Sequence, residues 1–202
     1  MRREQERPEW KPRTKLGMLV TANKITSMEE VFENGYRVQE SEIIRALLPD
    51  IRNEVVHVGI VQKQTDAGEM TRFSAIVAAG NESGWLGIGK GKAAQMRNAI
   101  DKATNAALLN VIPIKLGCGS WECRCNQRHS VPFRVEGKGG SVKVEILPGP
   151  RGLGIVAGEN IQNLLKLAGI KDAWTKTYGS TNTMSSTTKA VYNALRSTYS
   201  VG

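Results

Sequence analysis

Between positions 53 and 110 the sequence changes from β-compatible runs separated by turns to apolar residues at helical spacing. This single change constrains the fold more than any other feature of the sequence. The first part predicts β-strands separated by turns that are rich in glycine and polar residues. The expected strands cover residues 55–61, 71–79 and 85–89, with turns at 64–68 and 80–84. Because residues 93–110 then show helical spacing, we expect a three-stranded meander closed by one helix over residues 53–116.

The helix predicted at residues 93–110 has an apolar stripe that is rich in alanine. The residues expected to be buried are Met96, Ile100, Ala103 and Ala107. Small side chains let a helix pack close to a sheet.

A second α+β unit is expected over residues 131–202. Strands at 131–136 and 141–147 predict a hairpin around the glycine-rich turn at 137–140, and residues 148–158 predict a loop or bent strand. The remaining elements are a helix at 160–168 capped by Gly169, a strand at 173–178 and a helix at 187–199. The expected order is β-β-α-β-α.

The amino-terminal part, residues 1–52, predicts a basic extension that carries two short helices. Pro8 and Pro12 disfavour a helix at the start, so residues 1–20 are expected to be an extended arm that orders on a partner. Ser27 followed by Glu30 forms a capping box for the first helix. The second is expected at residues 41–48.

The charge balance indicates a polyanionic partner. The chain has 202 residues, 40% of them hydrophobic, and a net charge of +9, with a pI near 9.6. Such an excess of cations favours nucleic acid first and an acidic membrane surface second. No apolar run is long enough for a membrane span, and the charged start carries no secretory signal core. We therefore expect a cytoplasmic protein.

The stretch GWLGIGKGKAA, residues 84–94, begins like a phosphate-binding P-loop, but Gly91 stands where the magnesium-ligating Ser or Thr belongs. Nucleotide hydrolysis is therefore not expected. Two interpretations stay open: a strand-to-helix corner without a ligand, or a corner that meets an RNA phosphate with Lys90 and Lys92 beside free helix amides. The only histidines are His57 and His129, and no catalytic triad or carboxylate pair stands out. We predict no enzymatic activity.

Several separated stretches resemble one protein family. They are TRFSAIVAAGNESGWLGIGKGKA at 71–93, GKGGSVKVEILPGPRGLGIVAG at 137–158 and LAGIKDAWTKTYGST at 167–181. In this order they resemble small-subunit ribosomal protein five. EWKPRTKLG at 9–17 and GCGSWECRC at 117–125 resemble its archaeal branch in particular.

This resemblance implies a double-stranded-RNA-binding-like β-β-β-α domain followed by a small left-handed β-α-β type domain. It implies a structural ribosomal protein that binds 16S-type rRNA where the head and body of the small subunit meet, beside the mRNA entry path. It also implies contact with ribosomal protein four, a shared effect on decoding accuracy, and ribosomal protein eight as a neighbour. The alternatives are a free-standing double-stranded-RNA-binding regulator, which would not need the second domain, and an enzyme.

The resemblance also implies candidate RNA-binding residues. The family's first hairpin loop corresponds to residues 62–72, where Lys63 and Arg72 keep the basic character. Asp66, Glu69 and Met70 stand where relatives often carry basic or amide side chains. The other candidates, in the glycine-rich corner and the second domain, are Gly87, Gly89, Lys90, Gly91, Lys92, Lys138, Lys143 and Arg151. For each lysine or arginine the alternative is an ordinary solvated surface charge.

The linker at residues 117–130 contains a candidate metal site. All three cysteines, Cys118, Cys123 and Cys125, lie here, and His129 follows them. Three thiolates and one imidazole fit a tetrahedral zinc site, although the spacing is not that of a standard zinc finger. The alternatives are unliganded thiols or a Cys118–Cys123 disulfide. Because the bacterial branch of the family lacks these cysteines, a metal cannot serve the family's shared function.

Overall fold

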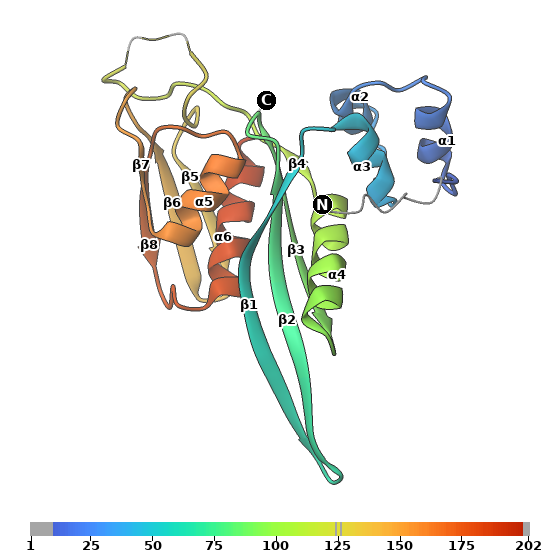
Figure 1. Cartoon of the computed structure of the whole chain (residues 1–202). Coiled ribbons are helices and arrows are strands. Elements are labelled where there is room, and N and C mark those ends of the chain that lie inside the picture. The colour runs from blue at the N-terminus through green and yellow to red at the C-terminus, as the bar shows by residue number, and fades with distance from the viewer. Residues whose placement is uncertain (1–9, 124, 126, 200–202) are drawn as a thin grey trace, which may run out of the picture. The chain divides into compact units, whose positions relative to one another are not determined.

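The computed structural model describes residues 10–123, 125 and 127–199. Figure 1 shows its elements in chain order. The chain divides into two compact units, residues 1–49 and 50–202. The first nine residues of the predicted basic arm lie outside the described residues. None of the helices in the described part combines the length and apolarity that a membrane crossing needs.

The described part of the first unit forms three helices instead of the predicted two. They are α1 (Lys15–Thr21), α2 (Met28–Glu33) and α3 (Ser41–Leu47). Helix α1 falls where we expected an extended arm. Its amino terminus is capped by Thr14, whose Oγ1 accepts a hydrogen bond from the N–H of Gly17 at 3.1 Å. Pro12 precedes the cap, so it removes no hydrogen bond from the helix.

Apolar residues of all three helices form the core of this unit, with Leu16 and Val20 packed on Val31 and Ile43. Ser27 caps α2 by accepting from the N–H of Glu29 at 3.1 Å. The carboxylate of Glu30 reaches back to the N–H of Thr26 at 3.4 Å. The predicted reciprocal capping of this helix is therefore present. Each N–H donor lies one residue before the donor of a standard capping box.

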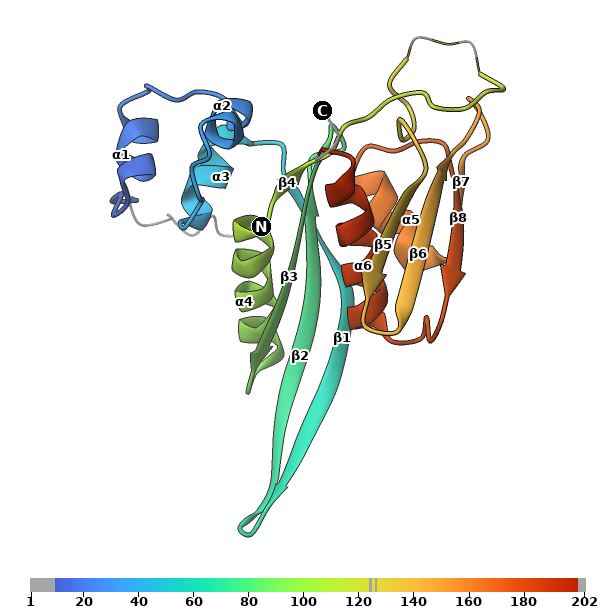
Figure 2. The same ribbon diagram turned by 180° about the vertical axis from the view of Figure 1, so that it is seen from behind.

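The first sheet of the second unit has the strand order β1-β2-β3-β4, with all neighbours antiparallel. Its elements are β1 (Arg52–Thr65), β2 (Gly68–Gly80), β3 (Trp85–Ala93), α4 (Met96–Leu109) and β4 (Ile112–Pro113). Helix α4 covers one face of the sheet, as Figures 1 and 2 show from opposite sides. The predicted meander closed by one helix is therefore confirmed. The two-residue strand β4 was not predicted.

The buried stripe of α4 consists of Ala99, Ala103 and Ala107. Met96 was predicted to belong to this stripe, but its side chain is 49% exposed. The helix starts at this residue, three positions later than predicted, so Met96 lies at its open end. The alanine stripe brings the helix backbone close to β3.

Strand β3 continues to Ala93 and so includes the predicted glycine corner. Its glycines occupy every second position, and all of them face α4. A Cβ atom at Gly89 would lie 2.1 Å from the carbonyl oxygen of Ala103. A Cβ atom at Gly87 would lie 2.2 Å from the Ala107 oxygen, and one at Gly91 would lie 2.4 Å from the Ala99 oxygen. These glycines therefore replace side chains by direct contact between strand and helix backbones.

The second sheet has the order β5-β6-β8-β7, with β7 parallel to β8. Its elements are β5 (Val135–Gly139), β6 (Val142–Pro148), β7 (Ile155–Val156), α5 (Glu159–Leu167), β8 (Ala173–Tyr178) and α6 (Met184–Ser197). The predicted hairpin forms, but Gly137 and Lys138 belong to β5 and the turn follows them. Strand β7 lies in the segment predicted as a loop or bent strand. Strand β8 coincides with its prediction, and Gly169 caps α5 with a φ of +88°.

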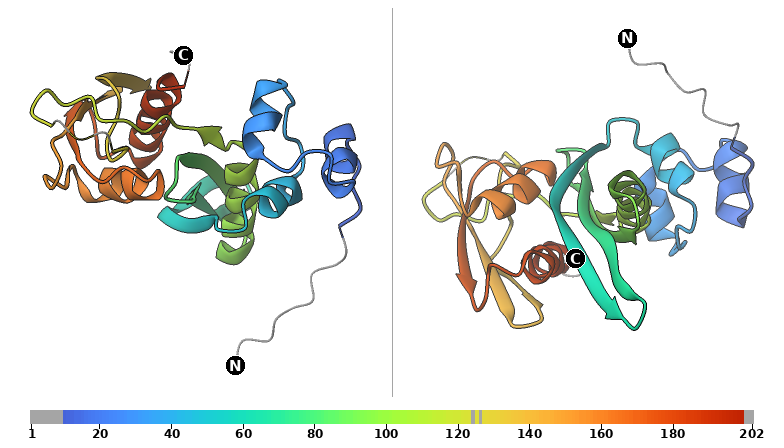
Figure 3. Two further views of the ribbon diagram at one scale, coloured as in Figure 1. Left: turned by 90° about the horizontal axis from the view of Figure 1, so that it is seen from above. Right: turned by 60° about the horizontal axis from the view of Figure 1, so that its bottom comes forward.

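Helices α5 and α6 lie between the two sheets, while α4 lies on the far side of the first sheet (Figure 3). One core joins these layers, because Ala78 and Leu86 of the first sheet cluster with Leu164, Val191 and Val144 of the second half. The α+β class and the two successive β-rich halves are as predicted. The left-handed crossover stays a prediction.

Candidate nucleic-acid interface and metal centre

The hairpin of β1 and β2 extends beyond the rest of the first sheet. Strand β3 ends its pairing at Phe73, so residues 61–72, which we name the arm, form a two-stranded ribbon (Figure 1). Its turn comprises only residues 66 and 67, because Thr65 already pairs with Gly68. The strands are thus longer and the turn shorter than predicted.

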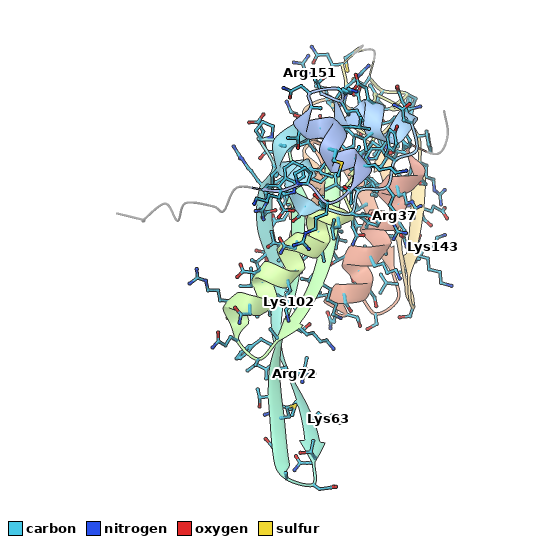
Figure 4. The ribbon with its side chains drawn as sticks, turned by 90° about the vertical axis from the view of Figure 1, so that its right-hand side faces the viewer. Arg37, Lys63, Arg72, Lys102, Lys143 and Arg151 are labelled. Carbon is cyan, nitrogen blue, oxygen red and sulfur yellow. The ribbon has the colours of Figure 1, made fainter. Side chains whose placement is uncertain are left out.

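Lys63 and Arg72 lie on one face of the arm (Figure 4). Lys63 pairs with Met70 and Val61 pairs with Arg72. Residues opposite each other in an antiparallel pair share a face, and so do residues two apart in a strand. The two cations therefore stand beside exposed apolar side chains, Val61 at 41% and Met70 at 48%.

The arm has two acidic residues, Asp66 in its turn and Glu69 on β2, and Glu69 faces away from the two cations. Gln62 donates from Nε2 to Glu69 Oε2 at 3.3 Å and to Thr71 Oγ1 at 3.4 Å, so these three side chains occupy the opposite face. From the sequence alone, Glu69 weakens the case for phosphate binding at this hairpin. Strand alternation separates its charge from Lys63 and Arg72.

Lys90 and Lys92 do not stand beside the first amides of α4, contrary to our expectation. Both are exposed residues of β3, and they alternate with the glycines that contact the helix. They therefore project from the sheet face opposite α4. The glycine-rich stretch presents lysines on one face and packs against the helix with the other.

Lys90 lines a groove of about 450 Å³ between the first sheet and α6. Lys189, Asn193 and Arg196 line it from α6, where their spacing of four and three residues places them on one helical face. Lys189 and Arg196 were not among the predicted residues. Their helical spacing was visible in the sequence, but it did not reveal that this face of α6 meets Lys90.

The candidate cations of the second sheet differ in their surroundings. Lys143 Nζ lies 2.8 Å from Glu136 Oε2 and 3.0 Å from Glu145 Oε1. Arg134 contacts the same two carboxylates at 2.9 and 2.8 Å. The Glu136 carboxylate, followed by that of Glu145, raises the pKa of Lys143 above its ordinary value. Lys138 is exposed on the neighbouring strand, directly opposite Lys143.

The Cys loop, residues 118–129, is closed at its base by two backbone hydrogen bonds between Gly117 and Ser130, of 2.8 and 2.9 Å. The loop has little core of its own, since Trp121 is 90% exposed. His129, by contrast, is only 5% exposed. The loop therefore depends on other contacts for its shape.

The predicted ligand set converges. The ligand atoms of Cys118, Cys123, Cys125 and His129, which we name the metal cluster, all lie within 4.8 Å of one another. Cys125 Sγ is 3.6 Å from Cys118 Sγ, and Cys123 Sγ is 3.8 Å from His129 Nε2. Tetrahedral zinc with Zn–S bonds of about 2.3 Å separates its sulfur ligands by about 3.8 Å. This cluster could hold a metal ion.

One distance in the metal cluster is shorter than a zinc site requires. Cys123 Sγ and Cys125 Sγ lie 2.9 Å apart. Binding of zinc would increase this distance by about 0.9 Å, to about 3.8 Å. All three cysteines are free, so the alternative of a Cys118–Cys123 disulfide is not what the structure contains.

The thiols of the metal cluster differ in acidity. The side-chain hydrogen bond between Cys123 and Cys125, followed by the backbone N–H of Arg151, lowers the pKa of Cys123 to about 6. Burial raises the pKa of Cys118 to about 11. One sulfur is therefore ready to bind a cation at neutral pH, while another must lose a proton on binding.

Comparison with known proteins identifies the family. Residues 51–115 match the family described as "Ribosomal protein S5, N-terminal domain", and residues 137–202 match "Ribosomal protein S5, C-terminal domain". Small ribosomal subunit protein uS5 of Cenarchaeum symbiosum is 65% identical over 201 residues, which cover 100% of this chain and 92% of that protein. The chain belongs to the uS5 family.

Two further uS5 proteins match nearly the whole chain. That of Thermofilum pendens is 52% identical and that of Pyrobaculum aerophilum 53% identical. The alignments cover 95% and 94% of this chain, and 95% and 87% of the two relatives. The predicted resemblance to the archaeal branch of the family is confirmed.

Membership in the uS5 family establishes the general role. The chain is a structural component of the small ribosomal subunit and not an enzyme. Its location is that of the subunit, in the cytoplasm. The first uS5 match spans the strands and helix of the first sheet, and the second starts inside β5. The Cys loop lies between the two matched regions.

Proposed function

We propose that the chain binds small-subunit rRNA near the junction of head and body, beside the mRNA entry path. The arm carries this proposal, because it projects Lys63 and Arg72 on one exposed face away from the core. Phosphate contacts of this kind fix the register of a protein on RNA without reading its sequence. The groove with Lys90, Lys189 and Arg196 offers a second set of cations. Lys92, Lys138 and Arg151 add exposed charge.

At this position the chain would contact ribosomal protein four and lie near ribosomal protein eight. With the former it would influence decoding accuracy. The resemblance to the family implies these roles. A free-standing double-stranded-RNA-binding regulator is the competing function, and it predicts a pool outside the ribosome.

The test replaces Lys63 and Arg72 by glutamate in a tagged full-length chain. We expect the unsubstituted chain to co-sediment with small subunits in a sucrose gradient, and the double variant to be depleted from that peak several-fold. Lys102→Glu, on the exposed side of α4 (Figure 4), controls for a change of charge outside the arm. Misreading of codons is measured in parallel.

Three outcomes would contradict the proposal. An unsubstituted chain found only at the top of the gradient favours the free regulator. Equal depletion by the variant and the control removes the special role of the arm. A double variant that loses its cooperative thermal unfolding indicates that Lys63 and Arg72 are structural residues.

We also propose that the metal cluster holds one structural zinc ion. The Cys₃His donor set suits zinc, and a closed set of four protein ligands is typical of structural rather than catalytic sites. When bound, zinc would replace the missing core of the Cys loop by four bonds.

The zinc proposal predicts one zinc per chain in the purified full-length protein, measured by elemental analysis. Cys123→Ser should remove it, whereas Ser120→Ala in the same loop should keep it. A metal-free protein with three freely titratable thiols would end this proposal.

A further inference from the structure

We propose that Asp172 is the positioning residue of the metal cluster and that it fastens the Cys loop to the loop at residues 149–154. This inference rests on the zinc proposal above and extends it to residues that are not ligands. It concerns three segments that are far apart in the sequence: His129 at the end of the Cys loop, the 149–154 loop, and Asp172 directly before β8.

The first observation is the contact between Asp172 and His129. His129 Nδ1 lies 2.8 Å from Asp172 Oδ2, and both side chains are buried, at 6% and 7% exposure. A carboxylate only accepts hydrogen bonds, so Nδ1 must carry the proton. In the neutral imidazole the other ring nitrogen, Nε2, then presents its lone pair, and it faces Cys123 Sγ at 3.8 Å. Asp172 thus sets the tautomer that a metal requires.

The second observation is that the backbone fixes the same pair. The carbonyl oxygen of His129 accepts from the N–H of Lys171 at 2.9 Å and from the N–H of Asp172 at 3.2 Å. Ring and main chain of His129 are therefore both held by residues 171 and 172. The Nε2 atom has a fixed direction before any ion arrives.

The third observation involves the other carboxylate oxygen. Asp172 Oδ1 accepts from the N–H of Gly154 at 2.8 Å and from the N–H of Gly152 at 3.1 Å. Both glycines have positive φ, of +77° and +86°, which lets two amides of one short loop converge on a single oxygen.

The metal cluster is therefore linked to the 149–154 loop through Asp172, because one carboxylate oxygen contacts His129 and the other accepts from Gly152 and Gly154. Binding of zinc would fix this link. The loop that it fixes carries Arg151, an exposed cation and a candidate RNA contact. The zinc ion would thus stabilise the position of Arg151 without touching its side chain.

The test uses the full chain with Asp172→Asn. Asparagine has nearly the same shape and can still accept from the two glycine amides, but its amide nitrogen would donate to His129 Nδ1. The proton of His129 would move to Nε2, where a metal must displace it. Loss of such a hydrogen-bond partner typically weakens metal binding about 10- to 100-fold. We expect this loss of zinc affinity in competition with a chromophoric chelator, with one zinc per chain still bound at saturation.

Two further measurements separate positioning from general destabilisation. Nitrogen chemical shifts of His129 in the metal-free protein should report a proton on Nδ1 in the unsubstituted chain and on Nε2 in the variant. Glu145→Gln removes another buried carboxylate of the same half of the protein, paired with Arg134 and Lys143, and should leave zinc affinity unchanged.

The link to the 149–154 loop is tested by hydrogen exchange. Removing zinc should accelerate exchange of the Gly152 and Gly154 amides and leave the β6 amides unchanged. Equal zinc affinity in Asp172→Asn and the unsubstituted chain would overturn the positioning role while the zinc site stands. Unchanged exchange on zinc removal would overturn the link to the loop. An unsubstituted chain that binds no zinc overturns both this inference and the zinc proposal.

Discussion

At the scale of single residues, Gly89 has no room for a side chain. A Cβ atom there would lie 2.1 Å from the oxygen of Ala103 and 2.2 Å from the nitrogen of Ala107, both backbone atoms of α4. A helix backbone cannot yield as a flexible side chain can. We expect Gly89→Ala to lower the free energy of unfolding by about 3 kcal/mol, the upper range for an overpacked core.

The matched control for this substitution is Gly158→Ala. Gly158 precedes α5 with a φ of −65°, and a Cβ atom there would meet nothing within 4 Å. Its replacement should change stability by no more than about 0.5 kcal/mol. Chemical denaturation of both variants checks the pair. Equal effects would mean that contact between β3 and α4 does not determine the cost.

A second residue-scale contrast concerns two lysines. Lys63 shares its face of the arm with Val61, Met70 and Arg72, whereas Lys143 contacts the carboxylates of Glu136 and Glu145. We expect Lys63→Gln to weaken rRNA binding more than Lys143→Gln does. Lys143→Gln should instead lower the thermal stability, because the buried carboxylate of Glu145 would lose the charge of Lys143. Arg134 would remain as its cationic partner. A filter-binding assay and a melting curve of each variant check this.

At the scale of elements, α1 is attached to α3 through one carboxylate. Glu40 accepts from the Trp10 indole N–H at 2.8 Å and from the N–H groups of Arg13 and Thr14 at 2.9 and 2.8 Å. Burial acts to raise the pKa of Glu40, but hydrogen bonds from Arg13, Trp10 and Thr14 outweigh it and the pKa lies below its ordinary value. Glu40 thereby joins the chain before α1 to the start of α3.

The lowered pKa of Glu40 predicts an acid-sensitive contact. Because the folded state binds this proton less tightly than the unfolded state, the stabilisation is complete above the ordinary pKa of glutamate, about 4.3. It is lost as the pH falls through the lower, folded value. The indole N–H resonance of Trp10 should shift over this range and should not do so in Glu40→Gln. Glu33→Gln, at an exposed position of α2, should titrate like the unsubstituted chain.

The sequence was sufficient for elements whose patterns are local. β-Compatible runs bounded by turn residues located β1, β2, β3 and β6, and β8 matched its predicted bounds. Helix α1 was not predicted, because Pro8 and Pro12 disfavour a helix. Both prolines precede Thr14, which caps the helix. Strand β4 has two residues and exists only through its pairing with β3, which no local pattern reveals.

The glycine stretch shows why the site was harder to predict than the fold. The lysines at 90 and 92 were recognised, but their direction depends on whether the segment is a loop or a strand. Gly87 and Gly89 are typical of loops in a sequence, but here they allow the backbone of α4 to pack against the strand. Likewise, Cys118 to His129 form a local pattern, whereas Asp172 lies 43 positions beyond His129 and only the fold brings it there.

At the scale of the whole molecule, the net charge of +9 predicts strongly salt-dependent binding. Each phosphate that the protein neutralises releases counterions, so the logarithm of the affinity falls linearly with the logarithm of the salt concentration. Removing Lys63 and Arg72 together should reduce this slope by about two. Titration of an rRNA fragment at several salt concentrations measures it. An unchanged slope would mean that the two cations do not reach phosphates.

The length of the arm sets how far its cations lie from the rest of the sheet. Gly68, next to the tip, lies five positions from Phe73, the residue where pairing of β2 with β3 ends. At about 3.4 Å per residue the ribbon therefore reaches roughly 17 Å beyond the sheet. A reach of this size lets one small protein bridge RNA segments that do not touch each other, as a strut does. A shortened arm that keeps both cations would then bind each segment alone and fail to hold them apart.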